Sequence, residues 1–151
     1  MRAVIQRVSA ARVTVGDRSV GAIGPGLLVF LGIATNDTEV QANWLLDKLL
    51  DLRIFEDDCG KFAQSLRDVH GELLLVSQFT LLADTRRGRR PSFSAAARPE
   101  AAVPLYEQVV ARARSQGISV ATGEFGAHMQ VELVNDGPVT VILDTEERRV
   151  D

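Results

Sequence analysis

Two short, uninterrupted apolar runs constrain the fold of this chain more than any other feature. Residues 27–31 are Leu-Leu-Val-Phe-Leu, directly after the turn signal Gly24-Pro25-Gly26, and residues 73–76 are Leu-Leu-Leu-Val. Runs of this length without polar alternation are typical of strands that are buried on both faces. We therefore expect both runs to lie centrally in a sheet that is covered on its two sides.

The segments around these runs favour further strands. Residues 4–8 and 13–15 alternate in polarity before the turn candidates Gly16 and Asp17, which predicts an opening hairpin. Residues 53–55 predict a short strand. Residues 129–134 and 139–143 predict two later strands, separated by a turn at Asn135-Asp136-Gly137-Pro138 because each of these residues favours turn geometry.

Two segments have helical spacing. Apolar residues recur in this way over residues 38–52, behind the N-cap candidates Asn36, Asp37 and Thr38. A second helix is predicted over residues 99–116, with Gly117 as its stop. Because proline is tolerated only in the first turn, we expect the regular part of this helix to begin near Pro104.

These elements indicate one α+β domain. Its 151 residues are enough for a single core, and no repeat or linker divides them. We expect a single compact domain in which a mostly antiparallel, barrel-like sheet is accompanied by two main helices. The domain is predicted to cover residues 1–144, and residues 145–151 are predicted to be a charged C-terminal tail.

Composition excludes several classes of protein. The longest apolar stretch, residues 27–34, is far shorter than the roughly 20 residues that span a bilayer. Arg2 and Arg7 leave no room for a signal peptide between them, and Cys59 is the only cysteine, so no intrachain disulfide can form. We expect a cytoplasmic protein with no membrane partner.

Conventional catalytic groups are scarce. The histidines are His70 and His128, and Cys59 lies in an acidic turn that disfavours its thiolate. Sequence leaves open whether His128 acts as a base for a distant serine, although a structural role is the favoured interpretation. Neither metal-ligand spacing nor a phosphate-binding glycine motif is present, so we expect no metal and no cofactor.

Polar side chains follow the second apolar run without a break. Ser77, Gln78 and Thr80 come directly after residues 73–76, where polar groups need partners or a ligand. The alternative is a sheet edge whose hydroxyls bond the neighbouring backbone. Spacing alone leaves both interpretations open.

A positive patch lies in the loop that comes next. Arg86, Arg87, Arg89 and Arg90 are clustered there, although the net charge of the chain is −3. Such a cluster is a candidate phosphate contact, and the alternative is a solvated charged loop, which charge alone favours.

Three segments together resemble the motifs of the D-aminoacyl-tRNA deacylases. They are Leu75-Val76-Ser77-Gln78-Phe79-Thr80-Leu81, Gly88-Arg89-Arg90-Pro91-Ser92-Phe93 and Asn135-Asp136-Gly137-Pro138-Val139-Thr140. The resemblance spans roughly residues 1–144 and implies the D-aminoacyl-tRNA deacylase-like fold. It also implies a cytoplasmic homodimer without a cofactor, whose active sites lie at the subunit interface and bind the aminoacylated 3′ end of tRNA.

The resemblance assigns roles to individual residues. Ser77, Gln78, Phe79 and Thr80 would line the catalytic pocket, where the protein chiefly orients an ester that is already activated and stabilises its oxyanion. Gly137-Pro138, with a cis peptide bond, would enter the partner's pocket and close the space that an L side chain requires. Glycine has no side chain to exclude, so glycine mischarged on tRNA, for example tRNA-Ala, would also be removed. Arg86, Arg87, Arg89 and Arg90 would bind tRNA.

Some alternatives remain open. The family usually has Met-Asn where this chain has Phe62 and Ala63, so any contact made there is in doubt. Thr80 has been considered a nucleophile in the family, but a positioning role is favoured because no histidine is near it in sequence. Phe79 and Gly137 favour the D-specific branch over relatives that remove L-alanine. A nucleic-acid-binding module without catalysis and a purely structural β domain are the competing functions.

Overall fold

The computed structural model describes residues 1–147. It contains one main sheet and two α-helices, as the sequence predicts. In chain order, the strands of this sheet are β1 (Arg2–Val15), β2 (Arg18–Ile23), β3 (Gly26–Gly32), β6 (Glu72–Ser77), β7 (Val120–Thr122) and β8 (Gln130–Asp144). A separate two-stranded sheet is formed by β4 (Phe55–Glu56) and β5 (Phe62–Gln64).

The sheet is mixed and curls into a nearly closed barrel. β1 pairs antiparallel with β2, β3 and β8, whereas β3 with β6 and β6 with β7 are parallel pairs. Gly21 of β2 packs directly against the backbone of Thr122 in β7, so the two ends of the sheet approach each other. The central position predicted for the two apolar runs is confirmed, because β3 lies between β1 and β6.

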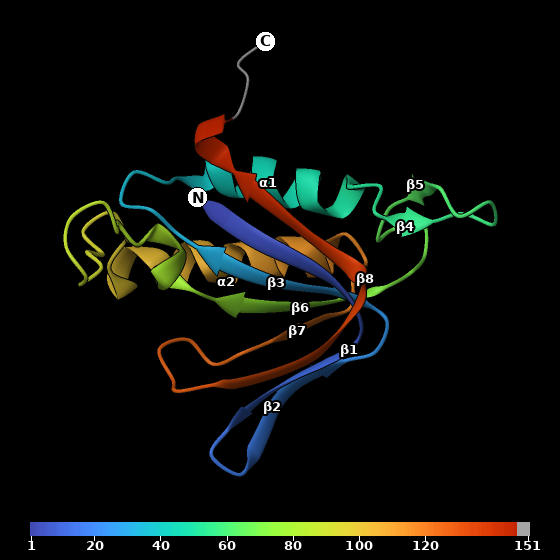
Figure 1. The fold of residues 1–151 in the computed structure, drawn as a ribbon, viewed down its shortest axis with the longest axis horizontal. Coiled ribbons are helices and arrows are strands. Elements are labelled where there is room, and N and C mark those ends of the chain that lie inside the picture. The colour runs from blue at the N-terminus through green and yellow to red at the C-terminus, as the bar shows by residue number, and fades with distance from the viewer. Residues whose placement is uncertain (148–151) are drawn as a thin grey trace.

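Both helices, α1 (Glu39–Asp51) and α2 (Pro99–Ser115), share one core with one face of the sheet (Figure 1). Leu45 and Leu49 of α1 are fully buried there, and Val109 of α2 is nearly so. A smaller core, which includes Val13, Leu28 and Leu74, fills the interior of the barrel. None of the helices among residues 1–147 is long and apolar enough to cross a membrane.

The first helix begins where the sequence predicts it. The Thr38 hydroxyl accepts a hydrogen bond from the Val40 N–H, and the Gln41 side chain accepts one from the Thr38 N–H, which is a capping box. The prediction for α2 was wrong at Pro104, because the helix begins at Pro99 and continues through Pro104. Pro104 has no N–H to donate to the Glu100 carbonyl. Because Glu100 is exposed, water can bond this carbonyl instead.

The predicted turn at residues 135–138 is also wrong. β8 is one continuous strand with a bulge against β1: Gln6 pairs with Thr140 and Val8 with Asn135, so Arg7 alone faces the four residues 136–139. The Asn135 amide donates to the carbonyl of Arg7 at 2.9 Å and to that of Val139 at 3.0 Å. The side chain thus replaces the missing ladder bonds, and pairing resumes beyond the bulge.

Two smaller differences concern element ends. The short strand expected at residues 53–55 is β4, which begins at Phe55 and pairs with β5. β6 ends at Ser77, and the chain then forms the 3₁₀ helix η1 (Phe79–Leu82). Of the predicted tail, Thr145–Glu147 forms a short 3₁₀ helix, and residues 148–151 lie outside the described residues.

Candidate active site

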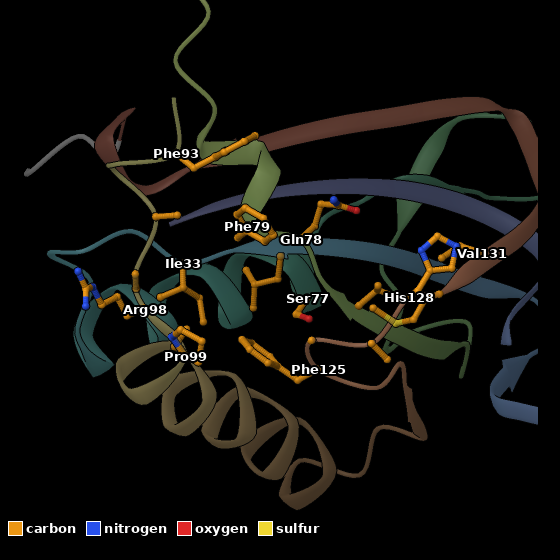
Figure 2. Close-up of a pocket in the computed structure, with 18 residues that line it drawn as sticks. Ile33, Ser77, Gln78, Phe79, Phe93, Arg98, Pro99, Phe125, His128 and Val131 are labelled. Carbon is orange, nitrogen blue, oxygen red and sulfur yellow. The ribbon is translucent and has the colours of Figure 1, made fainter. Parts of the chain in front are cut away.

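A cavity of about 540 Å³ opens where β3 and β6 end. Its lining comes from four parts of the chain: the end of β3, residues 76–79, the segment from Phe93 to the start of α2, and residues 125–129 with the start of β8. Figure 2 shows Ser77 between Phe79 and Phe125, with Arg98 and His128 at opposite ends of the view. The carboxyl ends of parallel strands meet at this edge, which is the usual place for a ligand site in such a sheet.

Aromatic rings form much of the wall. Phe79 is 56% exposed and packs edge-to-face on Phe93, with ring centroids 5.2 Å apart. Phe125 packs on Tyr106 with ring centroids 6.0 Å apart. The buried Tyr106 hydroxyl donates a hydrogen bond to the Leu75 carbonyl at 2.7 Å. Burial raises the pKa of Tyr106 to about 12, so this hydroxyl keeps its proton at physiological pH.

The polar segment after β6 is held against the end of β3. The Gln78 N–H donates to the Leu31 carbonyl at 2.8 Å, which fixes where the strand ends. Gly32 permits the close approach of η1, since a Cβ there would lie 3.0 Å from the Gln78 carbonyl oxygen and 3.1 Å from Leu81 Cβ, and closer still to the Leu82 side chain. The Arg2 guanidinium bonds the Leu81 carbonyl at 2.9 Å and so ties η1 to β1.

The four predicted catalytic residues are not equivalent. Ser77, Gln78 and Phe79 line the cavity, whereas Thr80 is exposed and is not part of its lining. The Thr80 hydroxyl accepts a hydrogen bond from the Gln78 amide, which is not a base that could activate it as a nucleophile. Within residues 1–147, the backbone N–H groups of Phe79 and Thr80 have no hydrogen-bond acceptor and remain free to bind one.

Gly137 and Pro138 lie elsewhere. Their peptide bond is cis, both residues are exposed, and Gly137 borders a separate recess beside Arg7, Phe55 and Asp136. Neither residue lines the cavity that contains Ser77. A single chain therefore does not bring the two predicted parts of the site together.

The predicted arginine cluster divides into two kinds. Arg86 is paired with Asp84 at 2.7 Å, and the side-chain hydrogen bond from Arg86 lowers the pKa of Asp84 to about 2. Within residues 1–147, no ion pair joins Arg87, Arg89 or Arg90 to an acidic residue, and all three are exposed. Arg86 orders the loop, and the other three arginines remain available to a phosphate.

Sequence reasoning missed several lining residues. Phe93 lies in one of the three motifs, but Arg98, Phe125 and Met129 carried no signal that linked them to Ser77. His128, for which a structural role was favoured and a role as a base for a distant serine was left open, lines the cavity and is exposed. Among residues 1–147, no group of three or more His, Cys, Asp or Glu side chains is placed to hold a metal ion.

Comparison with known proteins agrees with the motifs. The family model described as D-Tyr-tRNA(Tyr) deacylase matches residues 4–144. A D-aminoacyl-tRNA deacylase of Roseiflexus sp. (strain RS-1) is 61% identical over 96% of this chain and 94% of its own length. Its counterpart in Clostridioides difficile (strain 630) is 55% identical over 97% and 99%.

A solved structure gives the same picture at the level of the fold. The structure named c-Myc DNA Unwinding Element Binding Protein is 42% identical, with a TM-score of 0.90 over 96% of this chain and 99% of its own. The matches to the family model and to the two relatives extend over almost the whole chain. This chain therefore belongs to the D-Tyr-tRNA(Tyr) deacylase family of ester hydrolases.

Proposed function

We propose that this protein hydrolyses the ester bond of D-aminoacyl-tRNA, releasing free tRNA and the D-amino acid. The observation that carries the proposal is the aromatic cavity at the end of β6, with Ser77, Gln78 and Phe79 in its wall. Phe79, Phe93 and Phe125 line this cavity, and stacking of an unpaired base on an aromatic ring contributes about 1–3 kcal/mol per base. The 3′ adenosine of tRNA fits this chemistry.

Catalysis in this proposal depends on shape and backbone dipoles. The aminoacyl ester is already activated, and the neighbouring ribose 2′-hydroxyl assists its hydrolysis. The free N–H groups of Phe79 and Thr80 are the proposed donors to the developing oxyanion. Ser77 and Gln78 orient the ester, and Thr80 supports Gln78 through its hydroxyl.

Chiral discrimination in this proposal needs a second copy of the chain. Gly137-Pro138 is exposed and lies away from its own cavity, so it would act in the cavity of the partner within a homodimer. There its backbone would contact the α-amino group and exclude L side chains. Rigid exclusion rejects a whole class of substrates, which a hydrophobic pocket alone does poorly. Glycine on tRNA, for example on tRNA-Ala, would be removed as well.

The setting of the reaction follows from its substrate. Arg87, Arg89 and Arg90 would contact tRNA phosphates, with Arg86 holding the loop through Asp84. The protein would act in the cytoplasm, after the synthetase, as a proofreading enzyme. It would need no cofactor.

The direct test is to incubate the purified protein with D-tyrosyl-tRNA, L-tyrosyl-tRNA and glycyl-tRNA. Rapid loss of the D-tyrosyl and glycyl esters, with the L-tyrosyl ester intact, is expected. Val40→Ala, on the exposed side of α1, is a control that should behave as the wild type. Equal slow decay of the D and L esters would refute the proposal.

The name of the 42% identical structure favours a second candidate, DNA binding without catalysis. One double variant distinguishes the two functions. If binding of nucleic acid is the function, Gln78→Ala combined with Pro138→Ala leaves binding and the biological effect intact. If deacylation is the function, the same variant loses discriminating hydrolysis.

A further inference from the structure

The Arg7 side chain connects three parts of the chain around the bulge. It lies on β1 and is only 6% exposed. Its Nε donates to the Asp136 carbonyl at 3.0 Å, and its Nη1 donates to the Ile54 carbonyl at 2.8 Å. The first bond is to the residue that precedes Gly137, so the position of the bulge depends on the geometry of this guanidinium.

Phe62 covers the guanidinium from the β4–β5 hairpin. The Arg7 Cζ atom lies 5.6 Å from the centroid of the Phe62 ring, within the range of a cation–π contact. The ring belongs to neither hydrophobic core and is 55% exposed, so the core does not explain its presence. The carboxylates of Glu56 and Asp136 approach the same guanidinium at 3.7 and 3.4 Å.

We propose that Phe62 is a positioning residue for chiral discrimination, acting through Arg7 on Gly137-Pro138. The ring shields one side of the guanidinium from water, which strengthens its hydrogen bond to the Asp136 carbonyl. A bulge that is held more firmly leaves less room for an L side chain. The inference rests on the proposed role of Gly137-Pro138.

The experiment compares two substitutions of the exposed ring. Phe62→Leu keeps an apolar side chain but removes the aromatic face, whereas Phe62→Tyr keeps the face. The ratio of kcat/KM for D-tyrosyl-tRNA to that for L-tyrosyl-tRNA is measured for both, with Val40→Ala as a control on an exposed apolar position. The melting temperature and the sedimentation of each variant are measured alongside.

Phe62→Leu is expected to lower the D/L ratio by about threefold to tenfold, the range that the loss of one cation–π contact supports. The change comes from faster L hydrolysis, with D hydrolysis and the melting temperature unchanged. Phe62→Tyr is expected to keep the wild-type ratio, because the aromatic face is retained. A purely structural role for the ring would lower the melting temperature and leave the ratio as it was.

Three results would overturn this inference but not the proposed function. The first is an unchanged ratio in Phe62→Leu while the wild type discriminates, which leaves the proposed function standing. The second is an equal loss in Phe62→Tyr, and the third is a loss that accompanies dissociation of the assembly. A wild-type protein that hydrolyses both esters equally would refute the proposed function and this inference with it.

Discussion

The cavity around Ser77 and the bulge at Gly137-Pro138 are built in opposite ways. The cavity is recessed and mostly apolar, and packing between η1, β3 and the start of α2 gives it its shape. The bulge is exposed, and a few hydrogen bonds from Arg7 and Asn135 hold it in place. One region is a recess, and the other is an exposed surface that lies outside the cavity of its own chain. This difference implies that the two regions can be damaged separately.

The largest effect on the rate of hydrolysis is expected when η1, beside the cavity, is pushed away from β3. Gly32→Val places a branched side chain against the Gln78 carbonyl and the Leu82 side chain, so η1 must move away from β3. A displacement of about 1 Å costs on the order of 100-fold in rate. We expect hydrolysis of all substrates to fall by that order in a single-turnover assay. Wild-type rates in a folded variant would contradict the assigned position of the reaction.

The bulge is tested by adding a side chain to it. Gly137 has a φ of 147°, which L residues rarely adopt, and a Cβ there would lie 2.6 Å from the Val139 nitrogen. Gly137→Ala is expected to lower discrimination by about tenfold or more, because rigid exclusion fails when the backbone shifts. D hydrolysis should change less than L hydrolysis. If steady-state kinetics give an unchanged ratio of kcat/KM for the D and L esters, Gly137 has no role in chiral discrimination.

The arginine loop should affect substrate capture more than chemistry. Combined Arg89→Ala and Arg90→Ala substitutions are expected to raise KM for tRNA. They should also make the slope of log binding constant against log salt concentration less steep by about 0.7 for each lost phosphate contact with a single strand. The single variants Arg86→Ala and Arg89→Ala are the matched pair, and Arg86→Ala should alter the slope less, because Asp84 already neutralises Arg86. Equal slopes for these two single variants would show that the pairing does not matter.

The smallest effect is expected at Tyr106, which packs on Phe125 of the cavity wall. Tyr106→Phe removes one buried hydrogen bond, but the Leu75 carbonyl keeps the Gly123 N–H at 3.2 Å as a donor. The cost in the free energy of unfolding should be about 1 kcal/mol, measured by urea denaturation. Because the folded-state pKa of Tyr106 is raised to about 12, its contribution is complete below the unfolded value near 10 and is lost as the pH rises through 12. If the free energy of unfolding does not fall over this pH range, the Tyr106 hydroxyl is not buried as described.

The elements that sequence predicted well are those that a single physical pattern determines. Burial on both faces identified residues 27–31 and 73–76, and a capped apolar stripe identified α1. Local residue preferences failed at the bulge, because the bonds from the Asn135 amide that keep β8 continuous depend on tertiary pairing with β1.

The candidate site could be predicted only in part for the same reason. Ser77 and Gln78 stand out because they are polar residues at the end of an apolar strand. Phe125 and His128 reach the cavity from a distant loop, and nothing in their sequence surroundings indicates it. The pairing of Arg86 with Asp84 depends on loop geometry that charge counting does not contain.

The central claim is that the cavity of one chain works with the bulge of another. A purified heterodimer of one Gly32→Val chain and one Gly137→Ala chain tests it most directly. If the parts act across subunits, the intact cavity of the second chain meets the intact bulge of the first. The heterodimer then hydrolyses D-tyrosyl-tRNA and spares L-tyrosyl-tRNA. Hydrolysis of the L ester at about half the rate of the Gly137→Ala homodimer, which has two intact cavities instead of one, would show that each chain guards its own cavity and would contradict the claim.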